Sequence, residues 1–124
     1  DEFDGVDTTG TNGSGAVVQS ATATGTLVTL AAFGSADNGT YGMFSSGGAV
    51  TTWTPGTGFT ELADVVTPTN SINVMSEWRN DNDTSVDGTP AAGPSDNGGI
   101  AIEIKFAAAG GAAPRLRTLM GVGI

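Results

Sequence analysis

The chain has 124 residues, thirteen acidic and four basic side chains, and a formal net charge of −9 at pH 7. This length predicts one domain, and the negative charge argues against nucleic acid or an anionic membrane as a partner, since both carry phosphate. The chain has no cysteine and no histidine. It therefore lacks a disulfide framework, the commonest metal ligand and any catalytic group that requires imidazole.

The first half of the chain predicts short strands separated by turns, because Gly, Thr, Ser and Asn dominate and good helix formers are scarce. The opening DEFDGVD is typical of a strand that enters a turn, which suggests a fragment or a processed product. Residues 15–34 contain two strand-like runs joined around Gly25. Asn38-Gly39 predicts a β-hairpin. Two shorter strands are expected at 40–48 and 50–55.

The second half continues the same pattern of strands. Residues 58–67 predict a strand with a bulge or bend, and 71–80 predict a half-buried strand of alternating side chains. In GIAIEIKFA, the three isoleucines and the phenylalanine share one face, which we expect to cover the core. Ala, Glu and Lys share the other face, which we expect to meet solvent.

These elements together predict an all-β fold, an antiparallel β-sandwich that is jelly-roll-like and carries a C-terminal extension. The sandwich is expected to span residues 1–106, either whole or as a fragment of a larger domain. Residues 107–114 form an Ala/Gly hinge, and residues 115–124 form a docking peptide or the last strand. Residues 8–15 and 79–99 contain few apolar side chains and are predicted to be long loops.

The acidic stretch DNDTSVDG is the strongest candidate for a metal site. Asp81 and Asp83, with Asp87 nearby, place oxygen ligands at alternating positions, which suits calcium. An EF-hand, however, needs Gly at its sixth position and Glu at its twelfth, where this chain has Val86 and Ala92. Calcium is therefore the weaker interpretation, a solvated acidic loop is favoured, and no cofactor is predicted.

Four carboxylates are candidates, by type alone, for the acid pair of a glycoside hydrolase: Glu61, Asp64, Glu77 and Glu103. Glu77 and Glu103 occupy strand positions that are expected to be exposed. No second signal accompanies these acids, so we predict no catalytic residue and no enzymatic activity.

The two tryptophans, Trp53 and Trp78, are candidates for stacking on a sugar, because an aromatic ring offers a flat apolar face. The alternative, which the sequence favours, is that both rings pack at the ends of the sandwich.

The C-terminal segment separates charge from the rest of the chain. Residues 1–104 hold all thirteen acids and one base, whereas residues 105–124 hold three bases and no acid. After the Ala/Gly hinge, RLRTLMGVGI combines arginine with apolar side chains, a composition suited to adding a strand to a partner or lying in its groove. The residues predicted to make this contact are Arg115, Leu116, Arg117, Leu119 and Met120. The alternative is that the segment is the last strand of its own sandwich.

Four stretches carry a resemblance to a known family: EFDGVDTTG, TTWTPGTGFTELADV, INVMSEWRN and GGIAIEIKFAA. In this order they resemble the second half of a β-sandwich domain that occurs in phage virion structural proteins and some bacterial surface proteins. The resemblance covers roughly residues 1–106. It implies a β-sandwich and supplies no catalytic residues. The acidic stretch is longer than the family pattern needs, and the C-terminal segment lies outside it.

The sequence therefore leads to the expectation of a non-enzymatic structural subunit of an extracellular assembly. A phage virion protein is the most concrete form, as a capsid decoration, head-fibre or tail-associated protein. Its partners would be other copies of itself or neighbouring virion subunits, and its location the virion or an extracellular surface. The alternatives are a carbohydrate-binding module of a surface or tail protein and a self-assembling surface filament subunit.

Overall fold

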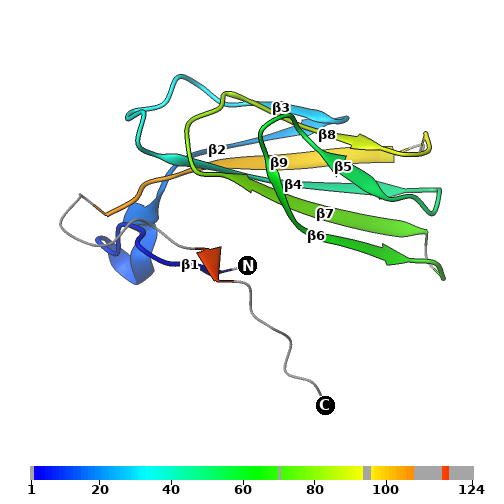
Figure 1. The fold of residues 1–124 in the computed structure, drawn as a ribbon, viewed down its shortest axis with the longest axis horizontal. Coiled ribbons are helices and arrows are strands. Elements are labelled where there is room, and N and C mark those ends of the chain that lie inside the picture. The colour runs from blue at the N-terminus through cyan, green and yellow to red at the C-terminus, as the bar shows by residue number, and fades with distance from the viewer. Residues whose placement is uncertain (1, 70, 94–95, 108–115, 118–124) are drawn as a thin grey trace, which may run out of the picture.

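The computed structural model describes residues 2–69, 71–93, 96–107 and 116–117. Two antiparallel sheets pack against each other, as Figure 1 shows, which confirms the predicted all-β sandwich. Helical structure in the described part is confined to a short 3-10 segment, Thr11–Ala16. Within the same residues no helix is long and apolar enough to cross a membrane.

The larger sheet has five strands and the smaller sheet has three. The larger sheet has the order β2 (Val17–Thr24), β9 (Asp96–Ile104), β4 (Gly39–Gly47), β7 (Ile72–Arg79) and β6 (Thr60–Thr67). The smaller sheet has the order β3 (Leu27–Thr29), β8 (Ser85–Pro90) and β5 (Trp53–Pro55). Outside both sheets, β1 (Glu2–Phe3) pairs with β10 (Leu116–Arg117).

The strand pairing is nested along the chain. Strand β2 pairs with β9, β3 with β8 and β4 with β7, so the chain behaves as one long hairpin wound into two sheets. This is jelly-roll-like topology. Strands β5 and β6, at the centre of the nesting, lie at edges of different sheets.

The core between the sheets is built around two aromatic rings. Phe44 of β4 and Trp53 of β5 stack with ring centroids 5.7 Å apart. Phe44 is opposite Gly99 of β9, where an added Cβ would lie 2.6 Å from the ring. The lack of a side chain at Gly99 therefore lets the ring lie against the backbone of β9. The other core side chains are Val28, Leu30, Phe59, Met75, Val86 and Ala101.

The prediction for the faces of β9 is wrong at positions 100–103 and correct at Ile104, which is 4% exposed. Ala101 and Glu103 are fully buried and point into the sandwich, whereas Ile100 and Ile102 are only half-buried on the opposite face. Lys105, beyond the strand, is exposed as predicted. The alternation was correct, but large side chains from other strands already fill the core, so the small Ala101 faces inward.

Two predictions of local structure are also wrong. The turn before Asn38-Gly39 does not join a hairpin, because the strands on either side, β3 and β4, belong to different sheets. The predicted loop 79–99 contains β8, which pairs with β3 and β5. The strand at 72–79 and the bulge in β6, between Glu61 and Ala63, are confirmed.

Candidate functional site

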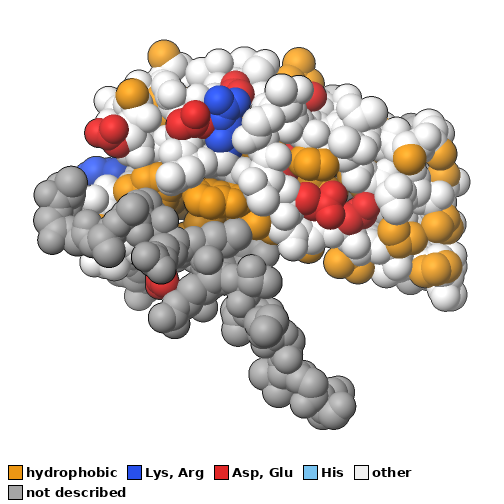
Figure 2. Space-filling view, in the orientation of Figure 1, with side chains coloured by type: hydrophobic (Ala, Val, Ile, Leu, Met, Phe, Trp, Pro, Cys, Tyr) orange, Lys and Arg blue, Asp and Glu red, His pale blue; other side chains and the backbone are white. Residues whose placement is uncertain are grey.

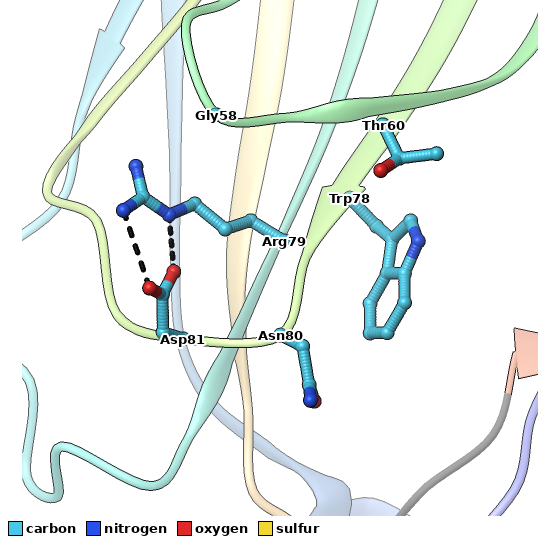
Figure 3. A pocket seen from close by; sticks show the side chains of 6 residues that line it. All are labelled: Gly58, Thr60, Trp78, Arg79, Asn80 and Asp81. Carbon is cyan, nitrogen blue, oxygen red and sulfur yellow. Dashed lines mark hydrogen bonds and ion pairs between the residues drawn. The ribbon is translucent and has the colours of Figure 1, made fainter.

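The structure has an open surface pocket of about 450 Å³ where β7 ends. Its lining comes from the turn before β6, from β6 itself and from the end of β7, as Figure 3 shows. The lining residues are Gly58, Thr60, Trp78, Arg79, Asn80 and Asp81. The pocket therefore combines an indole ring with hydroxyl, amide and charged groups.

Arg79 is held in place from three sides. Its guanidinium donates to both carboxylate oxygens of Asp81, and its Nη1 donates to Asp83 Oδ2 at 2.7 Å. Its charge also lies 5.9 Å from the centre of the Phe59 ring. The carboxylate of Asp81 raises the pKa of Arg79 above its usual value. Gly58, with φ of +84°, permits this packing, because a Cβ there would lie 3.0 Å from Nη1.

Arg79 also bears on the calcium interpretation of the acidic stretch. It occupies both oxygens of Asp81 and one of Asp83, while the backbone N–H of Ser85 donates to the other oxygen of Asp83 at 2.9 Å. Asp87 lies on β8, opposite Leu27. The residues that the structure describes contain no group of three acidic side chains suited to a metal ion. The geometry thus gives calcium no support, and a calcium site remains a prediction.

The two tryptophans have different environments. Trp53 is 3% exposed and stacks on Phe44 in the core, so its geometry gives no support to the candidate glycan contact at this residue. Trp78 is half-buried and lines the pocket. Phe3 of β1 lies near Trp78, with ring centroids 6.0 Å apart, and makes an edge-on contact with Tyr41. Trp78 is therefore the tryptophan with a surface position.

Glu103 is a fully buried carboxylate with several hydrogen-bond donors, contrary to the exposed position expected for it. Its Oε1 accepts from the backbone N–H of Gly34 at 3.1 Å and from Asn38 Nδ2 at 2.5 Å. Its Oε2 accepts from Gln19 Nε2 at 2.6 Å. Since these donors come from β2 and from the segment between β3 and β4, Glu103 ties both to β9.

Glu77 is the second fully buried carboxylate, and its predicted exposure is also wrong. Its Oε2 accepts from the backbone N–H of Gly56 at 2.8 Å, and its Oε1 has no partner among the described residues. Burial raises the pKa of Glu77 to about 7, and the negative charges of Asp87 and Asp83 act in the same direction. Glu77 is thus a titratable group inside the sandwich.

The four candidate acids do not form a pair on an open cleft. Glu61 is opposite Glu77 in the pairing of β6 with β7, but Glu61 is exposed and Glu77 is buried. Asp64 is half-buried and accepts from the backbone N–H of Trp53 at 2.8 Å. Glu103 is occupied by its three donors. The acids that lie inside the fold thus accept hydrogen bonds from other segments of the sandwich.

The predicted partner contact lies mostly outside the described residues. Arg115, Leu119 and Met120 fall in that part, while Leu116 and Arg117 form β10 and pair with β1. At the start of this segment, Lys105 forms an ion pair with Asp7 at 2.7 Å. This pair holds the pKa of Asp7 well below its usual value. Lys105, directly after β9, is thus already paired with Asp7, which precedes β2.

The sequence alone gave a partial signal for the pocket. Arg79, the one base among residues 1–104, stands two and four positions before Asp81 and Asp83. No local pattern marks the donors of Glu103, because Gln19 and Asn38 are distant in the chain. The chain matches no protein-family model, no curated protein and no solved structure. The interpretation of the site therefore depends on the geometry of these residues.

Proposed function

We propose that this chain is a non-enzymatic structural subunit of an extracellular assembly, and most concretely a phage virion protein of the decoration, head-fibre or tail-associated kind. The observation that carries the proposal is the separation of charge between the acidic body and the basic C-terminal segment. The ion pair of Lys105 with Asp7 and the pairing of β10 with β1 are contacts of the kind that such a segment would repeat on a neighbouring subunit.

The mechanism is mechanical. The sandwich provides a stable body whose surface carries spread acidic groups and few basic ones, as the face in Figure 2 shows. The C-terminal segment supplies arginine and apolar side chains to an acidic neighbour. Charge complementarity of this kind sets the orientation of the contact and speeds association. The resemblance of four sequence stretches to a sandwich domain of phage virion proteins supports the same proposal.

Light scattering tests this proposal by comparing the full chain with a chain that ends at Ala109. We expect the full chain to scatter as an oligomer, well above its monomer mass of 12.2 kDa, and the shortened chain to scatter as a monomer. Added salt should weaken the oligomer, since it screens the contact of arginine with carboxylate. Circular dichroism checks that both chains keep their strands.

A second variant covers the case in which the shortened chain does not fold. Replacement of Arg115 and Arg117 by serine keeps the chain length and removes the charge of the segment. Loss of assembly in this variant supports the proposal. Assembly of both variants at the level of the wild-type chain would contradict it.

A second candidate function is binding of a neutral glycan in the pocket at Trp78. The observation that favours it is the combination of a half-buried indole, the Thr60 hydroxyl and the Asn80 amide around an open pocket of about 450 Å³. Aromatic stacking with a few polar groups is the usual arrangement for such ligands.

Fluorescence titration with glycans tests this candidate. We expect a bound glycan to quench Trp78 in the wild-type chain. Titration calorimetry, which needs no tryptophan signal, should show that Trp78→Ala lowers affinity about tenfold or more, a loss of roughly 1.4 kcal/mol. Trp53→Phe is the matched control, because Trp53 lies in the core and its removal should leave affinity unchanged. Equal affinity of the Trp78→Ala variant would exclude the pocket as the glycan site.

A further inference from the structure

The face of the larger sheet that points away from the smaller sheet carries an unusual set of side chains. Cross-strand pairing places Tyr41, Met43 and Ser45 of β4 on this face, each in a row that runs across all five strands. We call these three rows the outer face. Its large apolar members, besides Tyr41 and Met43, are Trp78, Ile100, Ile102, Val74 and Val65. Every other position in the rows is Ser, Thr, Ala or Gly.

None of the positions in these three rows is charged. The first acid on this side, Asp96, pairs with Gly47 beyond the third row. Although the chain carries thirteen acids and a net charge of −9, this neutral area extends across all five strands of the larger sheet. Two other acids of the larger sheet, Glu77 and Glu103, are buried in the interior.

Parts of the outer face are open to solvent among the described residues. Met43 is 38% exposed and Val65 is 54% exposed, and Ile72, at the end of the face, is 48% exposed. Phe3 covers only one end, where its ring meets Tyr41 and Trp78. An exposed group of apolar side chains on a sheet face is typical of a contact surface.

We propose that the outer face is the surface on which a second copy of this chain docks, sheet face against sheet face. The proposal rests on the function proposed above, because it names the self-association surface of an assembly subunit. Two copies of a chain with a net charge of −9 repel each other. A contact between two outer faces brings no acid against another acid, and it buries Met, Val and Ile on both sides.

The strand edges favour this face as the place of contact. The edge strand β6 carries Glu61 and Asp64 together with a bulge, and the edge strand β5 ends at Pro55. The other edge of the larger sheet, β2, has an irregular register between Val17 and Gln19. Charges, bulges and proline all oppose the addition of a further strand. Face-to-face packing, the arrangement of the two sheets within the sandwich itself, does not need a free edge.

Charge substitution on the outer face tests the proposal in the full chain. The test variant is Met43→Lys with Val65→Lys, and the matched control is Leu27→Lys with Val50→Lys. Leu27 and Val50 are 48% and 51% exposed and lie outside the outer face. Both variants gain two positive charges, so the net charge of −9 becomes less negative by the same amount in each. A difference between them therefore reports the position of the charge.

Sedimentation equilibrium gives the association constant of each chain. We expect the test variant to associate about 100-fold more weakly than wild type, since it sets like charges against each other in the contact. The control should associate at least as well as wild type, because its overall repulsion is lower. Circular dichroism confirms that both variants fold, as expected for substitutions at exposed positions.

Three outcomes would overturn the proposal. Equal association of the test variant and the control means that the copies meet elsewhere, and the assembly function would stand without this surface. Stronger association of the chain that ends at Ala109 than of the full chain means that the C-terminal segment covers the outer face. A wild-type chain that stays monomeric at every concentration would remove both this surface and the self-assembly on which it rests.

Discussion

Replacement of Glu103 by alanine is expected to lower the free energy of unfolding by about 3–5 kcal/mol, a large part of the total for a domain of this size. The change removes the acceptor for Gly34, Asn38 and Gln19. Asn38 is 6% exposed, so water does not readily replace the carboxylate as its partner. Urea denaturation followed by circular dichroism gives the free energy of unfolding.

Glu103→Gln is the matched control, because it removes the charge of the carboxylate and keeps the shape of the side chain. Its carbonyl oxygen still accepts from Gly34 and Asn38, but its amide nitrogen meets Gln19 Nε2, which is also a donor. Gln19 cannot reverse its amide freely, because its Oε1 accepts from the backbone N–H of Ala31. We expect an intermediate loss of about 1–2 kcal/mol. A loss below about 1 kcal/mol in the alanine variant would show that these hydrogen bonds do not stabilise the fold.

The second expected result is a loss of stability with rising pH that originates in Glu77. The pKa of Glu77 is raised from 4.5 to about 7 in the folded chain. Its contribution is therefore fully present below pH 4.5 and is lost as the pH rises through 7, because ionisation then places a charge in the interior. Between pH 5.5 and 8.5 the free energy of unfolding should fall by about 2 kcal/mol.

Glu77→Gln should abolish this loss, since the amide stays neutral and its oxygen still accepts from Gly56. Glu61→Gln is the control, because it removes the same charge from the exposed residue opposite Glu77. The chain contains no histidine, which would otherwise titrate in this window. Thermal unfolding at several pH values gives the result. A wild-type chain whose pH dependence matches that of Glu77→Gln would contradict the raised pKa.

Much of the fold could be predicted because it is encoded locally. Turn residues separate the strands, and the alternation in 72–79 and the bulge in β6 both follow from neighbouring residues. The missed strand β8 contains Gly88 and Pro90, two residues that weaken any strand pattern. Gly88 nevertheless leaves room there for core side chains, because a Cβ would lie 2.8 Å from Met75 and 3.1 Å from Phe44.

The candidate site could be predicted only in part. The sequence identified Trp78, Asp81 and Asp83 as candidate residues, but it predicted that the two acids would be solvated or would bind calcium. In the structure Arg79 forms an ion pair with each of the two acids. That pairing depends on the conformation after β7, where Thr40 of β4 donates to the backbone carbonyl of Asp81 and accepts from the N–H of Asp83, both at 2.9 Å. A contact between residues about forty positions apart leaves no mark on the local pattern.

By itself, the sequence determined that this chain is an all-β protein with an acidic body and a basic C-terminal segment, because strand alternation, turn residues and charge are properties of short stretches. Only the tertiary structure decided which face of each strand turns inward. Alternation along a strand shows which side chains share a face, but it does not show which of the two faces is buried. In β9, Ala101 and Glu103 point into the sandwich. Phe44 and Trp53 already fill the core beside the small Ala101, and donors from distant segments bind the carboxylate of Glu103. Ile100 and Ile102 were thereby left on the outer face, whereas Ile104 is buried.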